Sequence, residues 1–112
     1  MKNLFTQKGY LMDTHTAVAG KVIEKYRLKT NDNTVTIVAS TASPYKFNSS
    51  VLNALGEDTK DKDEFEQLNA LYEQSGLEIP ESLSSLKNTQ PRFTTFCEKQ
   101  SQKDVILDFL SK

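Results

Sequence analysis

The chain has 112 residues, with 14 Lys and Arg against 15 Asp and Glu, so its formal net charge is −1 at pH 7. This length fits one domain with a modest core. The balanced charge gives no excess of basic residues for binding nucleic acid or an anionic membrane. No apolar run is long enough to span a bilayer, and the N-terminus lacks the charged-then-apolar order of a signal peptide.

The N-terminal part predicts two helices. Residues 2–9 form a candidate short helix ending at Gly9, because glycine readily adopts the left-handed conformation that follows a last turn. A longer helix is predicted at about residues 16–29, where apolar side chains recur at helical spacing. Its stripe consists of Val18, Val22, Ile23 and Tyr26, and its candidate N-caps are Asp13, Thr14 and Thr16.

The segment TVTIVAS, at about residues 34–40, is rich in β-branched residues and predicts an interior strand covered on both faces. A second, weaker strand is predicted at about 93–97. Because a lone buried strand leaves backbone groups unpaired, at about 1–3 kcal/mol each, its neighbours are expected from another chain or from a part of the same protein outside this sequence.

Helices dominate the rest of the chain. Ser43 followed by Pro44 predicts a helix start, with an N-cap and then a proline whose missing N–H is harmless there. This helix is expected to end at Gly56, and further helices are predicted at about 64–76, 80–89 and 101–112. The expected fold is therefore α/β: one strong strand, one weak strand and about five helices, as part of a larger parallel-sheet domain.

Metal and disulfide chemistry are not expected. The single cysteine, Cys97, cannot form an internal disulfide and favours a reducing, cytoplasmic setting, where we expect it to be a small core residue. Cys97 and the single histidine, His15, are too few for a zinc site. The acidic run at 57–66 lacks the spacing of a calcium loop and is interpreted as a solvated linker.

Two stretches in order resemble the C-terminal part of threonine synthase, a family of pyridoxal-phosphate enzymes of fold type II. They are GYLMDTHTAVAG, residues 9–20, and TVTIVASTASPYKF, residues 34–47. The family carries Asp-Pro-His-Thr-Ala-Val at a helix start and Thr-Ala-(Ser or His)-Pro-x-Lys-Phe after a strand. The resemblance covers about residues 9–55, with Thr14 where the family often has proline. Residues 56–112 resemble the family only in their acidic linker and closing helices.

The resemblance implies a parent enzyme that converts O-phosphohomoserine and water to threonine and phosphate with pyridoxal 5'-phosphate as cofactor. Residues 1–112 are then one C-terminal segment of a larger catalytic domain, with 1–55 as its cofactor-site half and 56–112 as linker and helical tail. The implied partners are the rest of the threonine synthase chain and the small-molecule substrate.

The resemblance assigns the hydroxyl of Thr41 to the pyridine nitrogen of the cofactor. Thr41 also follows the predicted strand at its carboxyl end, where ligands bind in open α/β sheets; the alternative is that it only satisfies backbone groups in a turn. Lys46 lies in the first turn of a helix, where a cation opposes the helix dipole. It faces either a substrate phosphate or solvent.

His15 and Thr16 open a helix whose free N–H groups can face cofactor or substrate, and an imidazole can transfer protons near neutral pH. We expect both residues to line the site and Asp13 to cap the helix. The Schiff-base lysine of the family lies upstream of the matched stretches, and the four scattered glycines form no phosphate-binding loop. The chain alone is therefore expected to be inactive.

A second interpretation is a free-standing small α/β module that binds a partner or an anion at the Ser43–Pro44 helix start. Such a module would associate with a second copy through its strand. A C-terminal piece, in contrast, should expose the sides of 34–40 and the smooth helix flank around Ala17 and Gly20.

Overall fold

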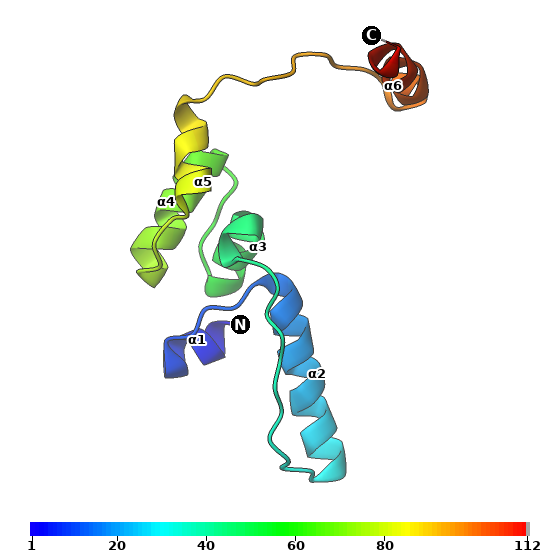
Figure 1. Cartoon of the computed structure of the whole chain (residues 1–112). Coiled ribbons are helices and arrows are strands. Elements are labelled where there is room, and N and C mark those ends of the chain that lie inside the picture. The colour runs from blue at the N-terminus through cyan, green and yellow to red at the C-terminus, as the bar shows by residue number, and fades with distance from the viewer. Residues whose placement is uncertain (112) are drawn as a thin grey trace.

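The computed structural model describes residues 1–111, and helices are the only regular secondary structure in this part of the chain. The expected α/β fold is wrong, since neither 34–40 nor 93–97 pairs with another strand in residues 1–111. The molecule is elongated, about 60 × 32 × 24 Å, with a radius of gyration of 19.3 Å. A compact domain of this length has a radius of gyration of about 13 Å. The chain therefore does not close around a single core (Figure 1).

The two N-terminal helices agree with the sequence pattern. Helix α1 spans Lys2–Lys8 and ends at Gly9, whose φ of 68° is the left-handed conformation that glycine adopts without strain. Helix α2 spans Thr14–Thr30, with Asp13 as its N-cap. Most of the α2 stripe is exposed, Val18, Val22 and Tyr26 included. The helix thus carries an apolar face that the described residues leave uncovered.

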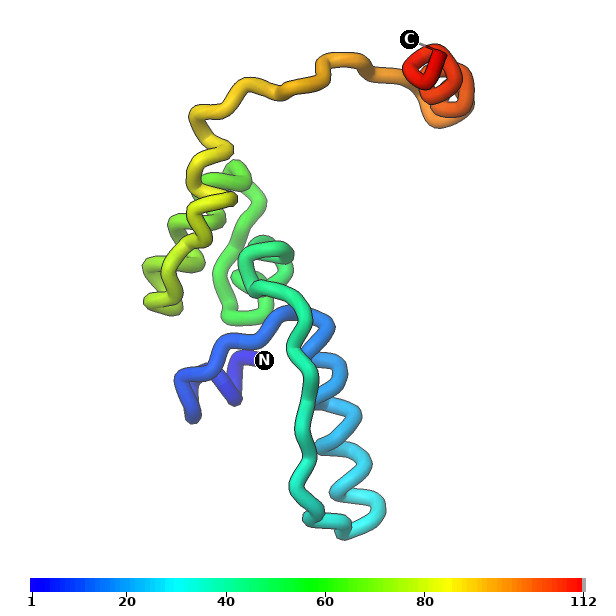
Figure 2. The backbone as a smooth tube through the Cα atoms, in the orientation of Figure 1, coloured from blue at the N-terminus to red at the C-terminus, as the bar shows by residue number. Residues whose placement is uncertain are grey.

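The predicted strand is an extended segment that runs beside α2 (Figures 1 and 2). Arg27 donates from Nη2 to the carbonyl of Thr34 at 3.1 Å and to the hydroxyl of Thr36 at 3.2 Å. The side chains of the extended segment are exposed, with 88% of Val35 and 92% of Ile37 accessible to solvent. The composition suits a strand, but a ladder needs a neighbour, and residues 1–111 supply none. The segment is therefore extended but unpaired among residues 1–111.

The core lies between α3, Asn48–Leu55, and α4, Glu64–Ser75. The expected helix start at Ser43 and Pro44 is confirmed, although its first turn, Pro44–Phe47, is a 3-10 helix that continues into α3. The fully or nearly fully buried apolar side chains of this cluster are Leu11, Tyr45, Val51, Leu52, Leu55, Leu68 and Leu71. This small core positions the 3-10 turn that contains Lys46 and the extended residues before it, which include Thr41.

The chain extends away from this core only after α5, Glu81–Ser84, whose Leu83 still packs against it. This short helix continues as a 3-10 turn, and an extended arm over 89–98 then leads to α6, Gln102–Leu110 (Figure 2). Phe96 is 92% exposed on the arm, and Cys97 is exposed with a free thiol, so the expectation of a core cysteine is wrong. None of the helices among residues 1–111 is both long and apolar enough to cross a membrane.

Candidate functional site

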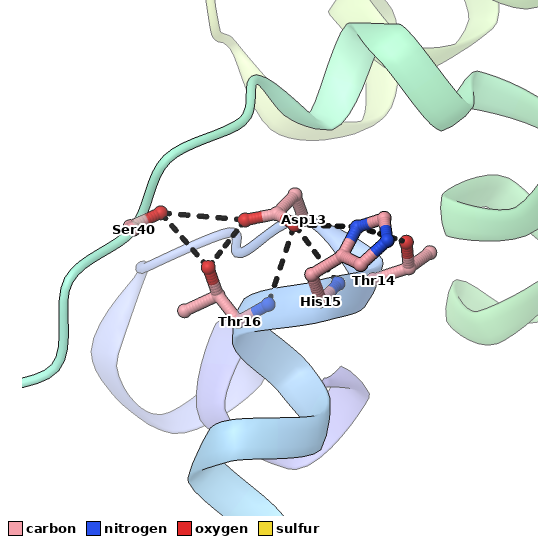
Figure 3. Close-up of polar contacts among 5 residues, drawn as sticks. All are labelled: Asp13, Thr14, His15, Thr16 and Ser40. Atoms are coloured by element: carbon pink, nitrogen blue, oxygen red, sulfur yellow. Dashed lines mark hydrogen bonds and ion pairs between the residues drawn. The ribbon is translucent and has the colours of Figure 1, made fainter.

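A buried carboxylate joins the start of α2 to the extended segment (Figure 3). Asp13 is 1% exposed. Its Oδ1 accepts the N–H groups of His15 at 2.9 Å and Thr16 at 3.3 Å, as an N-cap does. Its Oδ2 accepts the hydroxyl of Thr16 and, at 3.3 Å, the hydroxyl of Ser40. We call Asp13, Thr16 and Ser40 the Asp13 cluster.

The Asp13 cluster is electrostatically consistent with an ionised carboxylate. The hydrogen bond from the Thr16 hydroxyl holds the pKa of Asp13 below its ordinary value. Burial opposes this effect, while the backbone N–H groups and the Ser40 hydroxyl reinforce it. The two hydroxyls lie 3.0 Å apart. An ionised carboxylate can accept hydrogen bonds from both hydroxyls at once, and its negative charge strengthens both bonds.

His15 and Lys46 meet through Phe47, at the surface beside this cluster. The ring of His15 lies 4.9 Å from that of Phe47, between centroids, with an interplanar angle of 54°. The Nζ atom of Lys46 lies 5.6 Å from the same ring centroid, within cation–π range. Two of the predicted site residues, His15 and Lys46, therefore contact the same aromatic ring. Both are exposed and open to a ligand.

Thr41 lies next to Ser40 in the chain and is exposed. Within residues 1–111 its hydroxyl bonds to no other residue. The turn-satisfying role that was the alternative for Thr41 has no bond to support it, and the hydroxyl is free to meet a ligand. Thr16, in contrast, is buried, and its hydroxyl is directed at Asp13 and Ser40. Its role as a lining residue stays a prediction.

Sequence reasoning missed two residues of this region. Ser40 was not singled out, because only the folded chain places its hydroxyl beside a carboxylate 27 positions earlier. Phe47 was not singled out as a site residue, yet its ring contacts both His15 and Lys46. Its place in the matched Pro-x-Lys-Phe stretch was the one available signal.

No group of three or more metal-ligating side chains occurs in residues 1–111. The glycines also do not approach one another as a phosphate loop would require: Gly9, Gly56 and Gly76 each end a helix, while Gly20 lies inside α2. The free hydroxyl of Thr41 fits one polar contact to the cofactor ring. Residues 1–111 offer no glycine-rich loop for its phosphate.

The chain matches a known protein family. The family described as "Threonine synthase, C-terminal" matches residues 16–106, which is most of the chain. Among curated proteins no significant match was found, and none was found among solved structures. The family match includes Thr41 and Lys46 and extends well into the tail, beyond the two stretches that carried the resemblance.

Proposed function

Because the chain belongs to the family of threonine synthase C-terminal regions, we propose that it supplies one wall of a threonine synthase active site. The parent reaction converts O-phosphohomoserine and water to threonine and phosphate, in the cytoplasm. The observation that carries the proposal is the exposed, unbonded hydroxyl of Thr41 at the end of an extended segment that lacks strand partners.

Pyridoxal phosphate, when bound, supplies the electron sink for this reaction. On this chain, Thr41 is the residue that would contact its ring nitrogen. A neutral hydroxyl shares a hydrogen bond with that nitrogen but does not hold a proton on it as a carboxylate does. The ring is then a weaker electron sink, and other groups must carry more of the developing negative charge.

We assign His15 and Lys46 to the substrate side of the site. The Lys46 ammonium is a mobile point charge that can bind the phosphate of the substrate, and Phe47 restrains its position. His15 is restrained by the same ring and offers an imidazole for proton transfer. The Schiff-base lysine and the phosphate-binding loop belong to the upstream portion. The chain by itself is therefore inactive in this proposal.

The upstream portion also explains the exposed apolar surface. The extended segment 34–40 has the composition of an interior strand, and α2 exposes Val18 and Val22 next to it. We place the sheet of the upstream portion against these residues, where it pairs with the segment and covers the helix face.

The test replaces Thr41 in the assembled enzyme, formed by this chain and the upstream portion of a threonine synthase. Thr41→Val keeps the shape and removes the hydroxyl, and Thr41→Ser restores it. We expect Thr41→Val to lower kcat at least tenfold and to change the absorption of the bound cofactor, with Thr41→Ser close to the native chain. Equal kcat and spectra for all three forms would contradict the assignment. Self-association of the chain without affinity for the upstream portion would favour the interaction module instead.

A further inference from the structure

We propose that Asp13 is a positioning residue, which sets the place of Thr41 by holding Ser40 against the start of α2. This role rests on the proposed function, since it takes Thr41 as the cofactor contact. It differs from helix capping, because capping uses only one of the two carboxylate oxygens. Oδ1 accepts the two helix N–H groups, and Oδ2 accepts the two hydroxyls.

The first argument is that Ser40 provides the only hydrogen bonds that tie residues 37–42 to the rest of the described chain. Within residues 37–42 it alone forms hydrogen bonds to another residue, and both of them go to the Asp13 cluster. The preceding attachment is at Thr36, to Arg27, and the next is the helix start at Ser43. Without the bond at Ser40, the six residues between these points have no polar anchor.

The second argument is that Ser40 and Thr41 are neighbours in the chain, so the position of one constrains that of the other. Consecutive Cα atoms are about 3.8 Å apart, so a displacement of Ser40 moves Thr41 by nearly the same amount. Misplacement of a catalytic contact by about 1 Å can cost about 100-fold in rate. The anchor must also be stiff, and a buried, charged acceptor provides stronger hydrogen bonds than a neutral one.

The third argument is that the same carboxylate orients the other half of the site. By accepting the N–H of His15, Asp13 fixes the backbone from which the imidazole projects (Figure 3). That imidazole lies 4.9 Å from the ring of Phe47, between centroids. One buried group therefore sets the relative position of two segments that are far apart in sequence. An N-cap that served α2 alone would not need the bond to Ser40.

Three variants separate positioning from capping. Asp13→Ser keeps an N-cap of equal rank but has no second oxygen to reach Ser40. Ser40→Ala keeps the cap untouched and removes the partner. Ser40→Thr restores a hydroxyl at an exposed, extended position, where a β-branched residue is well accepted. Helix content of each variant is checked by circular dichroism, since all three should retain α2.

The first measurement uses the 112-residue chain alone. Nuclear Overhauser contacts between the side chain of Thr16 and the side chain of residue 40 should be present in the native chain and in Ser40→Thr, since the two hydroxyls lie 3.0 Å apart. They should be lost in Asp13→Ser and Ser40→Ala. Contacts that persist in both of these variants would overturn the proposal, because another interaction would then hold the segment.

The second measurement uses the assembled holoenzyme with pyridoxal phosphate and O-phosphohomoserine. Asp13→Ser and Ser40→Ala should each lower kcat about 10- to 100-fold, with little change in KM, because Thr41 contacts the cofactor rather than the substrate. Ser40→Thr should recover most of kcat. Native kcat in Ser40→Ala would overturn the positioning role. If the native assembled enzyme shows no turnover, the proposed function is overturned, and the positioning role with it. The contacts measured in the chain alone would still decide whether the Asp13 cluster joins the two segments.

Discussion

The substitution Ile37→Ala should weaken assembly with the upstream portion while leaving the chain itself intact. Ile37 is 92% exposed, so in the isolated chain its side chain contributes almost nothing to stability, and the change should stay within about 0.5 kcal/mol. If the upstream sheet buries it, the substitution removes three carbons at about 0.8 kcal/mol each, or about 2.4 kcal/mol. This corresponds to a dissociation constant that is about 50-fold larger.

Leu52→Ala is the matched control, a truncation whose cost is expected in the folding of the chain itself. Leu52 is fully buried between α3 and α4, so its truncation should cost about 2–5 kcal/mol of unfolding free energy in the chain alone. Urea denaturation of the isolated chain and calorimetric titration onto the upstream portion measure the two effects separately. Unchanged affinity in Ile37→Ala, or a loss of its unfolding free energy comparable to that of Leu52→Ala, would refute the reasoning.

Three further substitutions test the local physics. Tyr45→Phe removes the hydroxyl that donates to the carbonyl of Leu77 and should cost about 0.5–1.5 kcal/mol in urea denaturation, because that carbonyl loses its partner; an unchanged midpoint would contradict this. Asp63→Ala removes the capping box at the start of α4 and should lower unfolding free energy by about 0.5–2 kcal/mol, whereas Asp63→Ser should keep most of it. The folded pKa of Asp13 is lowered, so its contribution to stability is complete above the unfolded value of about 3.9 and declines as pH falls through the folded pKa. Acid titration followed by circular dichroism should show this component in the native chain and not in Asp13→Asn; identical acid profiles would exclude it.

The helices could be predicted because their signals are local. Gly9 and Gly56 end helices for a reason contained in their own backbone, and Ser43 with Pro44 starts one in the same way. Val51, Leu52 and Leu55 of α3 are buried, because α4 is close in sequence and supplies the facing side. Such features depend on few residues, and the sequence contains all of them.

The strand at 34–40 could not be settled in this way, because strand formation depends on a neighbour. The same residues that predict an interior strand stay single and exposed here, since residues 1–111 contain no strand to pair with them. Within the site, the residue types of Thr41, His15 and Lys46 were visible in the sequence. The bond between Asp13 and Ser40 was not, because it requires a fold that brings positions 27 apart into contact.

The most direct test of the central proposal is phosphate release from O-phosphohomoserine, measured with pyridoxal phosphate for the chain alone, the upstream portion alone and the two combined. Borohydride reduction and mass spectrometry then locate the lysine that carries the cofactor. The proposal predicts turnover only for the combination, with the reduced cofactor on a lysine of the upstream portion. Turnover by this chain alone, with a stoichiometric adduct on one of its own lysines, would show that it is a complete enzyme and contradict the proposal.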